Sequence, residues 1–275
     1  MEEIKLFIKE DIAMLGSEKV CALNEKRRNE KAGTFLKKEQ KREKRLSIPV
    51  VIMAGGLGTR LYPYTKILPK PLIPIGEKPI VEHIIDRFQE NGCSQFYMIV
   101  NNKKNMIKAY FSEIDKNYTL NYIDEKIPLG TGGGLCFLKN KINSTFILTN
   151  CDILIDYDYK KIYKYHKERR NLITMICAKK QFKVPYGVIE VNDNSEIENI
   201  REKPEMLFLI NTGMYIIDSK VIEEMEEATI GMPDIIHKYR KRGEKVGVFL
   251  IEEQKWLDMG EMEEMEKMKK RLEIE

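Results

Sequence analysis

One stretch constrains the fold more than any other: an apolar run that ends abruptly in glycines. Val50–Met53 is rich in β-branched residues, and glycines follow at positions 55, 56 and 58. Arg60 comes next, and Lys70 stands between two prolines ten residues later. This layout predicts a strand that feeds a polyphosphate-binding loop, because glycines let backbone N–H groups approach phosphate oxygens while Arg60 and Lys70 supply positive charge.

Two common phosphate loops do not fit this stretch. A Walker loop needs Gly-Lys-Ser/Thr after its glycines, and here Gly58 is followed by Thr59 and Arg60. The dinucleotide fingerprint needs a last glycine where this chain has Leu61. A P-loop NTPase and a dinucleotide-binding domain are therefore disfavoured.

Strand-like and helix-like segments alternate after the loop, which predicts an α/β fold. The expected sheet is mostly parallel with helices on both faces, and its ligands bind beyond the carboxyl ends of the strands. Helices are predicted at 79–88, 106–114, 219–226, 233–242 and 260–272. Further strands are predicted at 96–100, 120–123, 146–149, 172–178, 187–191, 197–201, 209–217 and 246–251.

Residues 1–47 differ in composition from the rest. A short helix is predicted for residues 4–15, and residues 26–45 are basic with little apolar content. We interpret residues 1–47 as an extension or linker ahead of a domain at 48–275, with a partner-binding or regulatory arm as the alternative.

The composition limits the classes of partner that the chain is expected to bind. The net charge of +4 does not by itself indicate a nucleic-acid partner. No apolar run reaches the roughly 20 residues that cross a bilayer, and the Met1–Glu3 start does not resemble a signal peptide, so a cytoplasmic location without membrane contact is expected. Five scattered cysteines predict reduced thiols rather than disulfides or zinc ligands.

The loop sequence GGxGTRLxPxTxxxPKPL resembles the signature of the sugar-1-phosphate nucleotidyltransferases, the nucleoside-diphosphate-sugar pyrophosphorylases. Five separated motifs follow the family's order, in a pattern similar to that of mannose-1-phosphate guanylyltransferase-like members. The resemblance implies a Rossmann-like, glycosyltransferase-A-like fold with a smaller sugar-binding β region. It also implies that an NTP and a sugar 1-phosphate react, with Mg²⁺, to give an NDP-sugar and pyrophosphate.

Two aspartates are the metal ligands that the resemblance implies. Asn150-Cys151-Asp152 resembles the family's Asn-Gly-Asp, although Cys151 replaces the glycine. Asp258 lies in Trp256-Leu257-Asp258-Met259-Gly260, which matches the family's Trp-x-Asp-x-Gly. Asp152 and Asp258 suit Mg²⁺, an oxygen-seeking cation that keeps several waters.

The resemblance also assigns the phosphate and sugar contacts. Arg60 and Lys70 are expected on the triphosphate, with Arg60 on the departing pyrophosphate. Glu202-Lys203-Pro204 resembles a motif whose lysine reaches the sugar phosphate and whose glutamate reaches the sugar hydroxyls. The expected catalytic residues are Arg60, Lys70, Asp152 and Lys203, and the expected sugar-binding residues are Tyr186, Gly187, Glu202, Asn211 and Gly213.

A second glycine-rich segment, Pro128–Gly134, resembles the part of the family that lies along the nucleobase. Counting back from Gly130 places Glu125 in the base-reading position. A carboxylate accepts two hydrogen bonds and donates none, which matches guanine and not thymine or uracil, so GTP is predicted. The expected nucleotide-binding residues are Ala54, Gly55, Gly56, Gly58, Thr59, Glu125, Pro128, Gly130 and Thr131.

Several alternatives stay open at this point. The base could instead be that of dTTP, UTP or CTP, and the sugar could be mannose, glucosamine, glucose or heptose. Phosphocholine as acceptor is disfavoured by Glu202, Asn211 and Gly213. A non-catalytic sensor of sugar nucleotides on the same fold is the rival from another class. Assembly into a homo-oligomer is also open, although relatives are often dimers or larger.

Overall fold

The computed structural model describes residues 45–260 and Met268. The helix predicted at 4–15 lies outside these residues, as does nearly all of the helix predicted at 260–272. Met268 is buried in the core. The described residues from Leu46 onward belong to one compact unit, and the division into 1–47 and 48–275 stays a prediction.

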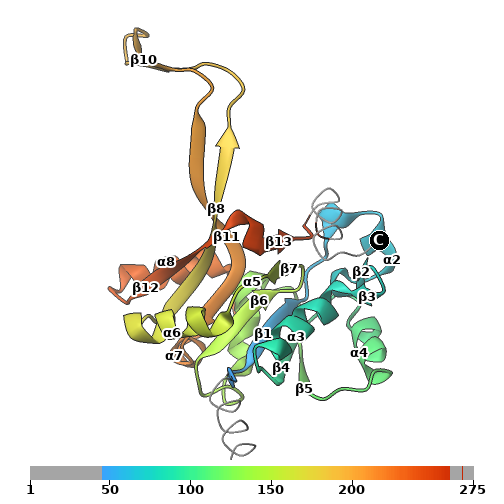
Figure 1. Cartoon of the computed structure of the whole chain (residues 1–275). Helices are drawn as coiled ribbons and strands as arrows, with labels where there is room; N and C mark the ends of the chain where they lie inside the picture. The colour runs from blue at the N-terminus through green and yellow to red at the C-terminus, as the bar shows by residue number, and fades with distance from the viewer. Residues whose placement is uncertain (1–44, 261–267, 269–275) are drawn as a thin grey trace, which may run out of the picture. The chain divides into compact units, whose positions relative to one another are not determined.

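A seven-stranded sheet forms the centre of this unit (Figure 1). The strand order is β12-β8-β11-β6-β1-β4-β5, and neighbours are parallel except that β11 is antiparallel to both β6 and β8. The predicted α/β class with a mostly parallel sheet is confirmed. The strands are β1 (Val50–Ala54), β4 (Gln95–Val100), β5 (Thr119–Asp124), β6 (Phe146–Asn150), β8 (Ile173–Lys183), β11 (Glu205–Ile217) and β12 (Val246–Glu252).

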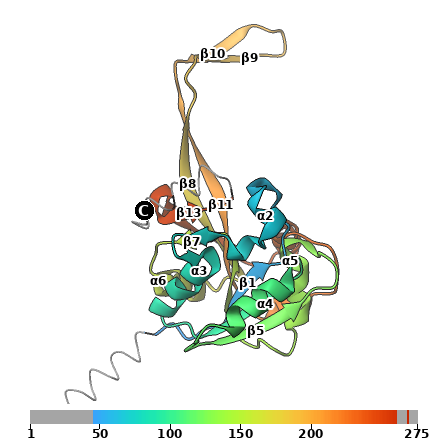
Figure 2. The ribbon, with the colours of Figure 1, turned by 90° about the vertical axis from the view of Figure 1, so that its right-hand side faces the viewer.

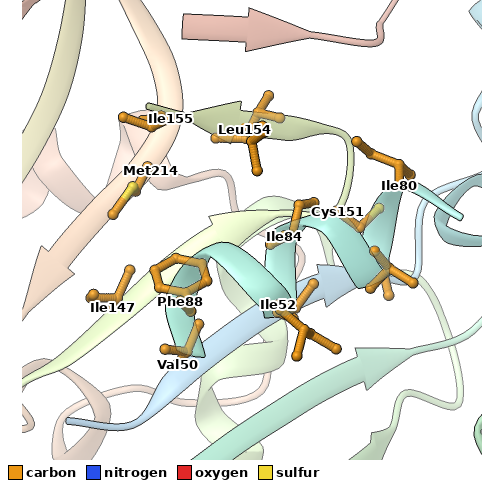
Figure 3. Packing of buried hydrophobic residues seen from close by; sticks show 14 of the residues in the cluster. Val50, Ile52, Ile80, Ile84, Phe88, Ile147, Cys151, Leu154, Ile155 and Met214 are labelled. Atoms are coloured by element: carbon orange, nitrogen blue, oxygen red, sulfur yellow. The ribbon is translucent and has the colours of Figure 1, made fainter. Parts of the chain in front are cut away.

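Helices cover both faces of the sheet, and each face has its own core. Val50 and Ile52 of β1 pack in one hydrophobic cluster and Val51 packs in the other, because successive side chains of a strand point to opposite faces. Figure 3 shows Ile84 and Phe88 of a helix above Val50 and Ile52. The first face carries α3 (Ile80–Glu90), α4 (Lys104–Ser112) and α6 (Tyr159–Arg169), and the second carries α5 (Gly130–Gly133), η3 (Gly134–Leu138), α7 (Lys220–Glu223) and α8 (Met232–Lys241).

Short elements complete the described chain. The helix predicted at 219–226 is shorter in the structure, because the Met225 N–H bonds to the Ile222 carbonyl in a tighter turn. No helix among the described residues is long and apolar enough to span a bilayer. The remaining elements are η1 (Thr59–Leu61), α2 (Tyr64–Ile67), η2 (Lys70–Leu72), β2 (Pro74–Ile75), β3 (Lys78–Pro79) and η4 (Glu253–Lys255).

The shortest strands, β2, β3, β7 (Ile153–Ile155) and β13 (Trp256–Asp258), were not predicted from the sequence. β7 and β13 pair antiparallel, with Asp258 opposite Ile153. Each has three residues, which is too short for an alternating pattern to be recognised. This pairing joins the segment after β6 to the segment after β12.

A two-stranded arm projects from the sheet at the carboxyl end of β8 (Figures 1 and 2). We define the arm as residues 179–210, which comprise the outer parts of β8 and β11 and a terminal hairpin of β9 (Val188–Val191) and β10 (Ile197–Arg201). The strands predicted at 172–178 and 209–217 are therefore too short. The polar residues Lys179, Lys180 and Gln181 follow the apolar run at 172–178, which indicates that a buried strand ends there. In the structure they continue the pairing with β11 outside the core.

Candidate functional site

A pocket of about 300 Å³ lies at the carboxyl ends of β1 and β6. β1 and β6 are parallel neighbours, so the glycine loop and Asn150–Asp152 emerge at the same edge of the sheet. The structure thus brings most of the predicted nucleotide-binding and catalytic residues together. The lining residues are Met53, Gly55, Gly56, Arg60, Lys70, Glu125, Pro128, Gly130, Thr131, Asn150, Cys151 and Asp152.

The glycine loop folds back toward Lys70. Gly58 has a φ of +66°, and its carbonyl accepts a hydrogen bond from the Thr65 hydroxyl at 2.9 Å. A Cβ at Gly58 would come within 2.8 Å of a Thr65 methyl carbon and 3.2 Å of the Lys70 Cβ. Glycine is therefore required here both for the backbone conformation and for the close approach. Gly58, Thr59 and Ala54 shape the loop from beside the pocket rather than from its lining.

A poorly exposed ion pair joins Lys70 and Asp152 in the pocket wall. The side chains are 14% and 8% exposed, respectively. Solvent and salt screen such a pair much less than a surface pair. Lys70 is held in η2 between two prolines, and Asp152 follows β6, so both charges are presented by ordered backbone.

Asp258 reaches the same place from the far end of the chain. The Met259 N–H donates to the Asp152 carbonyl at 2.9 Å, and the Gly260 N–H donates to Asp258 Oδ1 at 2.7 Å. Burial raises the pKa of Asp258, and the negative charge of Asp152 raises it further. The Arg60 guanidinium lies next to Gly260: a Cβ added to Gly260 would be 3.4 Å from its nitrogens. Two cations and two carboxylates are thus gathered in one cluster.

The two aspartates fit a hard divalent cation. Their carboxylates are close enough for the charge of one to raise the pKa of the other, and a cation would relieve that repulsion. Among residues 45–260 and Met268, no group of three or more His, Cys, Asp or Glu side chains could hold a metal ion. Asp152 and Asp258 therefore suit a cation that takes its other ligands from water and substrate.

Glu125 forms a buried acidic part of the pocket wall. Its side chain is 4% exposed, and within the part of the chain that the structure describes its Oε1 has no hydrogen-bond partner. Gly55 and Gly134 make room for the carboxyl group: a Cβ at Gly55 would lie 2.9 Å from Oε2, and one at Gly134 would overlap Oε1. Burial raises the pKa of Glu125 to about 7. An unpartnered buried acceptor facing a pocket is suited to a ligand that donates hydrogen bonds.

Four predicted sugar-side residues are gathered with one another but not with the pocket. Tyr186, Gly187, Glu202 and Lys203 all lie on the arm, where the Lys203 N–H donates to the Tyr186 carbonyl at 3.2 Å. Glu202 Oε2 stands 3.1 Å from where a Gly187 Cβ would be, and Lys203 Nζ lies 4.0 Å from Glu202 Oε1. None of the described residues that line the pocket belongs to the arm. We name these four residues the arm cluster.

Asn211 and Gly213 lie at the base of the arm, next to the pocket. The Gly213 N–H donates to Asn211 Oδ1 at 3.0 Å, and Gly213 packs so closely on the Asn150 side chain that a Cβ would overlap it. Asn150, Met53 and Cys151 line the pocket but were not predicted as site residues. The position of Asn150 at a strand end, directly before Asp152, is the signal that could have identified it.

The model of the nucleotidyl transferase family matches residues 49–274. The chain belongs to this family. Nucleotidyl transferase relatives include the bifunctional protein GlmU of Methanococcus maripaludis strain C7, which is 33% identical over 220 residues that cover 76% of this chain and 51% of that protein. A mannose-1-phosphate guanyltransferase of Hypocrea jecorina is 32% identical over 185 residues, which cover 64% of this chain and 51% of that protein.

Comparison with solved structures agrees with the fold. HddC from Yersinia pseudotuberculosis superposes with a TM-score of 0.65 at 25% identity, covering 82% of this chain and 99% of that one. The chain spans about half the length of the curated relatives it matches. Family membership confirms the resemblance that the motifs indicated.

Proposed function

We propose that the protein transfers a nucleotidyl group from a nucleoside triphosphate to a sugar 1-phosphate. The observation that carries this proposal is the cluster of Arg60, Lys70, Asp152 and Asp258 at the pocket, within a chain of the nucleotidyl transferase family. Two cations can neutralise a triphosphate, and two carboxylates can hold a divalent metal. The same four groups disfavour a non-catalytic sensor, which would not need them all.

The reaction requires the protein to position the two substrates and to stabilise negative charge, but it does not require a nucleophilic side chain. A phosphate oxygen of the sugar 1-phosphate forms a bond to the α-phosphorus while the bond from that phosphorus to the β-phosphate oxygen breaks, and pyrophosphate leaves with the electron pair. Because the attacking oxygen is already anionic, no side chain has to remove a proton. Arg60 and Lys70 stabilise the negative charge on the phosphates.

Members of this family generally use a divalent metal, and we propose Mg²⁺ held by Asp152 and Asp258. When bound, the metal would polarise phosphoryl oxygens and offset negative charge in the transition state. Asp152 also pairs with Lys70. The same carboxylate would therefore orient both the metal ion and the Lys70 ammonium group toward the phosphates.

We further propose that the nucleotide is GTP. The N1–H and N2–H₂ groups of guanine are two adjacent donors. The buried Glu125 carboxylate has two acceptor oxygens, and its Oε1 lacks a partner within the described residues. The mannose-1-phosphate guanyltransferase relatives support guanine as the base. The GlmU relatives are similarly identical to this chain but are not named as guanyltransferases, so the proposal of GTP depends on Glu125 rather than on similarity alone.

A matrix of nucleoside triphosphates against sugar 1-phosphates, with pyrophosphate release as the readout, tests the proposal. We expect release with GTP and at least one sugar 1-phosphate, and a loss of at least about 100-fold in Asp152→Ala. Asp115→Ala, which changes an exposed aspartate away from the pocket, is the matched control and should retain activity. No release from the wild-type protein with any pair would contradict the enzyme proposal.

A further inference from the structure

A second cavity lies at the opposite edge of the sheet from the pocket at β1 and β6, which we now call the first pocket. The volume of the second cavity is about 420 Å³, compared with about 300 Å³ for the first pocket. Its lining includes Leu172 just before β8, Lys245 just before β12 and Asp218 just after β11. The end of β11 pairs with the start of β6, so this edge is the one that the first pocket does not occupy. The two cavities share no lining residue within the described part of the chain.

Four cationic side chains line the second cavity. None of the four forms an ion pair with any residue that the structure describes. One of them, Arg170, is presented from a left-handed backbone with a φ of +52°, which glycine adopts more readily than arginine. Like charges around one cavity repel one another, and a bound anion would offset that repulsion. The four cationic residues are Lys167, Arg170, Lys220 and Lys245.

Three carboxylates also line the second cavity, and one of them is already neutralised. Glu224 pairs with Arg242 at 2.6 Å. Asp218 and Glu244 form no ion pair within the described residues, although Asp218 Oδ1 accepts the Lys220 backbone N–H at 3.1 Å. Four cations and two unpaired carboxylates leave an excess of two positive charges. A phosphate monoester carries a charge of about −1.5 to −2 at neutral pH, which balances this excess.

A buried, uncharged donor completes the lining. His166 is 1% exposed, and burial lowers its pKa to about 4, so its ring is neutral at pH 7. His166 Nδ1 lies 2.9 Å from the Thr174 hydroxyl oxygen, which also accepts a hydrogen bond from Asn171 Nδ2 at 2.9 Å. The hydroxyl hydrogen has no other acceptor among the described residues, which assigns it to Nδ1 and the ring proton to Nε2. The Nε2–H has no partner in the same part of the chain, although His166 lines the cavity, so it suits an acceptor on a ligand.

We propose that the second cavity binds a phosphorylated compound that also carries hydroxyl groups, the chemistry that sugar phosphates and nucleotides share. The phosphate lies among the lysine and arginine side chains, with which it forms charge-assisted hydrogen bonds. The hydroxyl groups donate to Asp218 and Glu244, which would repel a phosphate, and His166 Nε2–H donates to a ligand oxygen. The proposal does not depend on the function of the first pocket.

The chain contains three histidines, so the ring of His166 can report on the second cavity by NMR. With the histidine rings labelled with ¹³C, glucose 1-phosphate and uridine 5′-monophosphate are each titrated into the full chain at pH 7, up to about 10 mM. We expect the His166 signal to shift and to saturate. His83→Gln and His237→Gln identify the other two signals, and thus the signal of His166. No shift of the His166 signal with either compound would overturn the proposal.

Charge variants show which of the two cavities the compound occupies. Lys167→Ala/Lys245→Ala removes two exposed cations of the second cavity, and the concentration at half-saturation should rise by at least about tenfold. Lys161→Ala/Lys241→Ala, which removes two exposed lysines outside both cavities, is the matched control and should leave that concentration unchanged. Arg60→Ala, which alters the first pocket, should also leave it unchanged. A shift that disappears in Arg60→Ala and persists in the Lys167→Ala/Lys245→Ala variant would refute binding in the second cavity.

Matched compounds test the class of ligand. Glucose and uridine lack the phosphate and should bind at least about tenfold more weakly than glucose 1-phosphate and uridine 5′-monophosphate. Equal binding with and without the phosphate would contradict phosphate recognition. The tighter of the two phosphorylated compounds decides between a sugar phosphate and a nucleotide.

Inorganic phosphate tests the hydroxyl contacts, because it carries the charge without the sugar. It should bind more weakly than the phosphorylated sugar compounds. Glu244→Ala removes an acceptor for a hydroxyl and also removes a charge that repels phosphate, so it should weaken binding of glucose 1-phosphate and tighten binding of inorganic phosphate. If inorganic phosphate binds as tightly as the sugar compounds, or if both bind more tightly in Glu244→Ala, the cavity holds an adventitious ion only and the proposal fails.

Discussion

Met259 donates its backbone N–H to the carbonyl oxygen of Asp152 at 2.9 Å. This bond continues the pairing of β13 with β7 and fixes Asp258 beside Asp152, although the two residues are distant in the sequence. The metal-binding half of the proposed site therefore depends on a backbone ladder of three residue pairs rather than on flexible side chains.

Replacing Asp258 by Asn should separate function from stability. We expect kcat/KM to fall by about 100-fold or more, because one of two metal-binding carboxylates is lost. The melting temperature should not fall, because burial and the charge of Asp152 both disfavour the ionised form of Asp258. Pyrophosphate release and a thermal melt check the two parts. A melt that drops in parallel with activity would instead indicate a structural role.

Replacing Glu125 by Gln should change the preferred base. An amide offers a donor as well as an acceptor, so it pairs with uracil or thymine and loses one acceptor toward guanine. We expect the ratio of kcat/KM for GTP to that for UTP to fall by on the order of 100-fold or more, since a buried polar mismatch is costly. Glu113→Gln, on an exposed loop, is the matched control. An unchanged ratio would remove Glu125 from base recognition.

The affinity for GTP should depend on pH. In the proposed function guanine pairs with the Glu125 carboxylate, and burial raises the pKa of Glu125 to about 7 in the free protein. As the pH falls below 7 the group becomes protonated and presents a donor to the donors of guanine, so KM for GTP should rise by up to about tenfold per pH unit. Steady-state kinetics between pH 5.5 and 8.5 check this, and Glu125→Gln should flatten the profile.

The same group makes a prediction about the stability of the free protein. Its folded-state pKa of about 7 exceeds the ordinary value of 4.5, so the folded state holds the proton more tightly than the unfolded state. The resulting stabilisation is fully present below pH 4.5 and is lost as the pH rises through 7. Denaturant unfolding should show that Glu125→Gln increases the free energy of unfolding at pH 8 relative to wild type, and that this gain shrinks at pH 5.

Gly134, behind the Glu125 carboxyl group, and Gly56, in the pocket lining, should respond differently to the same substitution. A Cβ at Gly134 would overlap Glu125 Oε1, whereas a Cβ at Gly56 would meet nothing within 4 Å. Gly134→Ala should lower the free energy of unfolding by about 1–3 kcal/mol, and Gly56→Ala should leave it nearly unchanged. Adding Glu125→Ala should recover part of the Gly134→Ala loss in a double-mutant cycle. Equal effects at the two glycines would contradict the proposed packing of the carboxyl group.

The sequence was informative where one strand and its following loop make the site. The buried run before Gly55 and the run before Asp152 predict parallel strands, and parallel strands deliver their ends to one edge. The sequence was less informative where the structure of a segment depends on pairing with a segment that is distant in the chain. The β7 and β13 strands are too short for a pattern. The arm contains an apolar run at 206–210 that resembles a buried strand in the sequence but has no core to bury it. Motif order indicated that Lys203 belongs to the site, but it did not indicate where the arm would point.

Beyond Lys179, which still pairs with Glu252 of β12, the two halves of the arm pair with each other and with no other described strand. Its length can therefore change by matched two-residue steps in both strands without altering which side chains share a face. The arm cluster can also be replaced as a unit, since the pocket does not contact it. Under the proposed function, the arm is therefore a separable segment whose divergence among homologues would change the preferred sugar acceptor without altering the nucleotide-binding pocket.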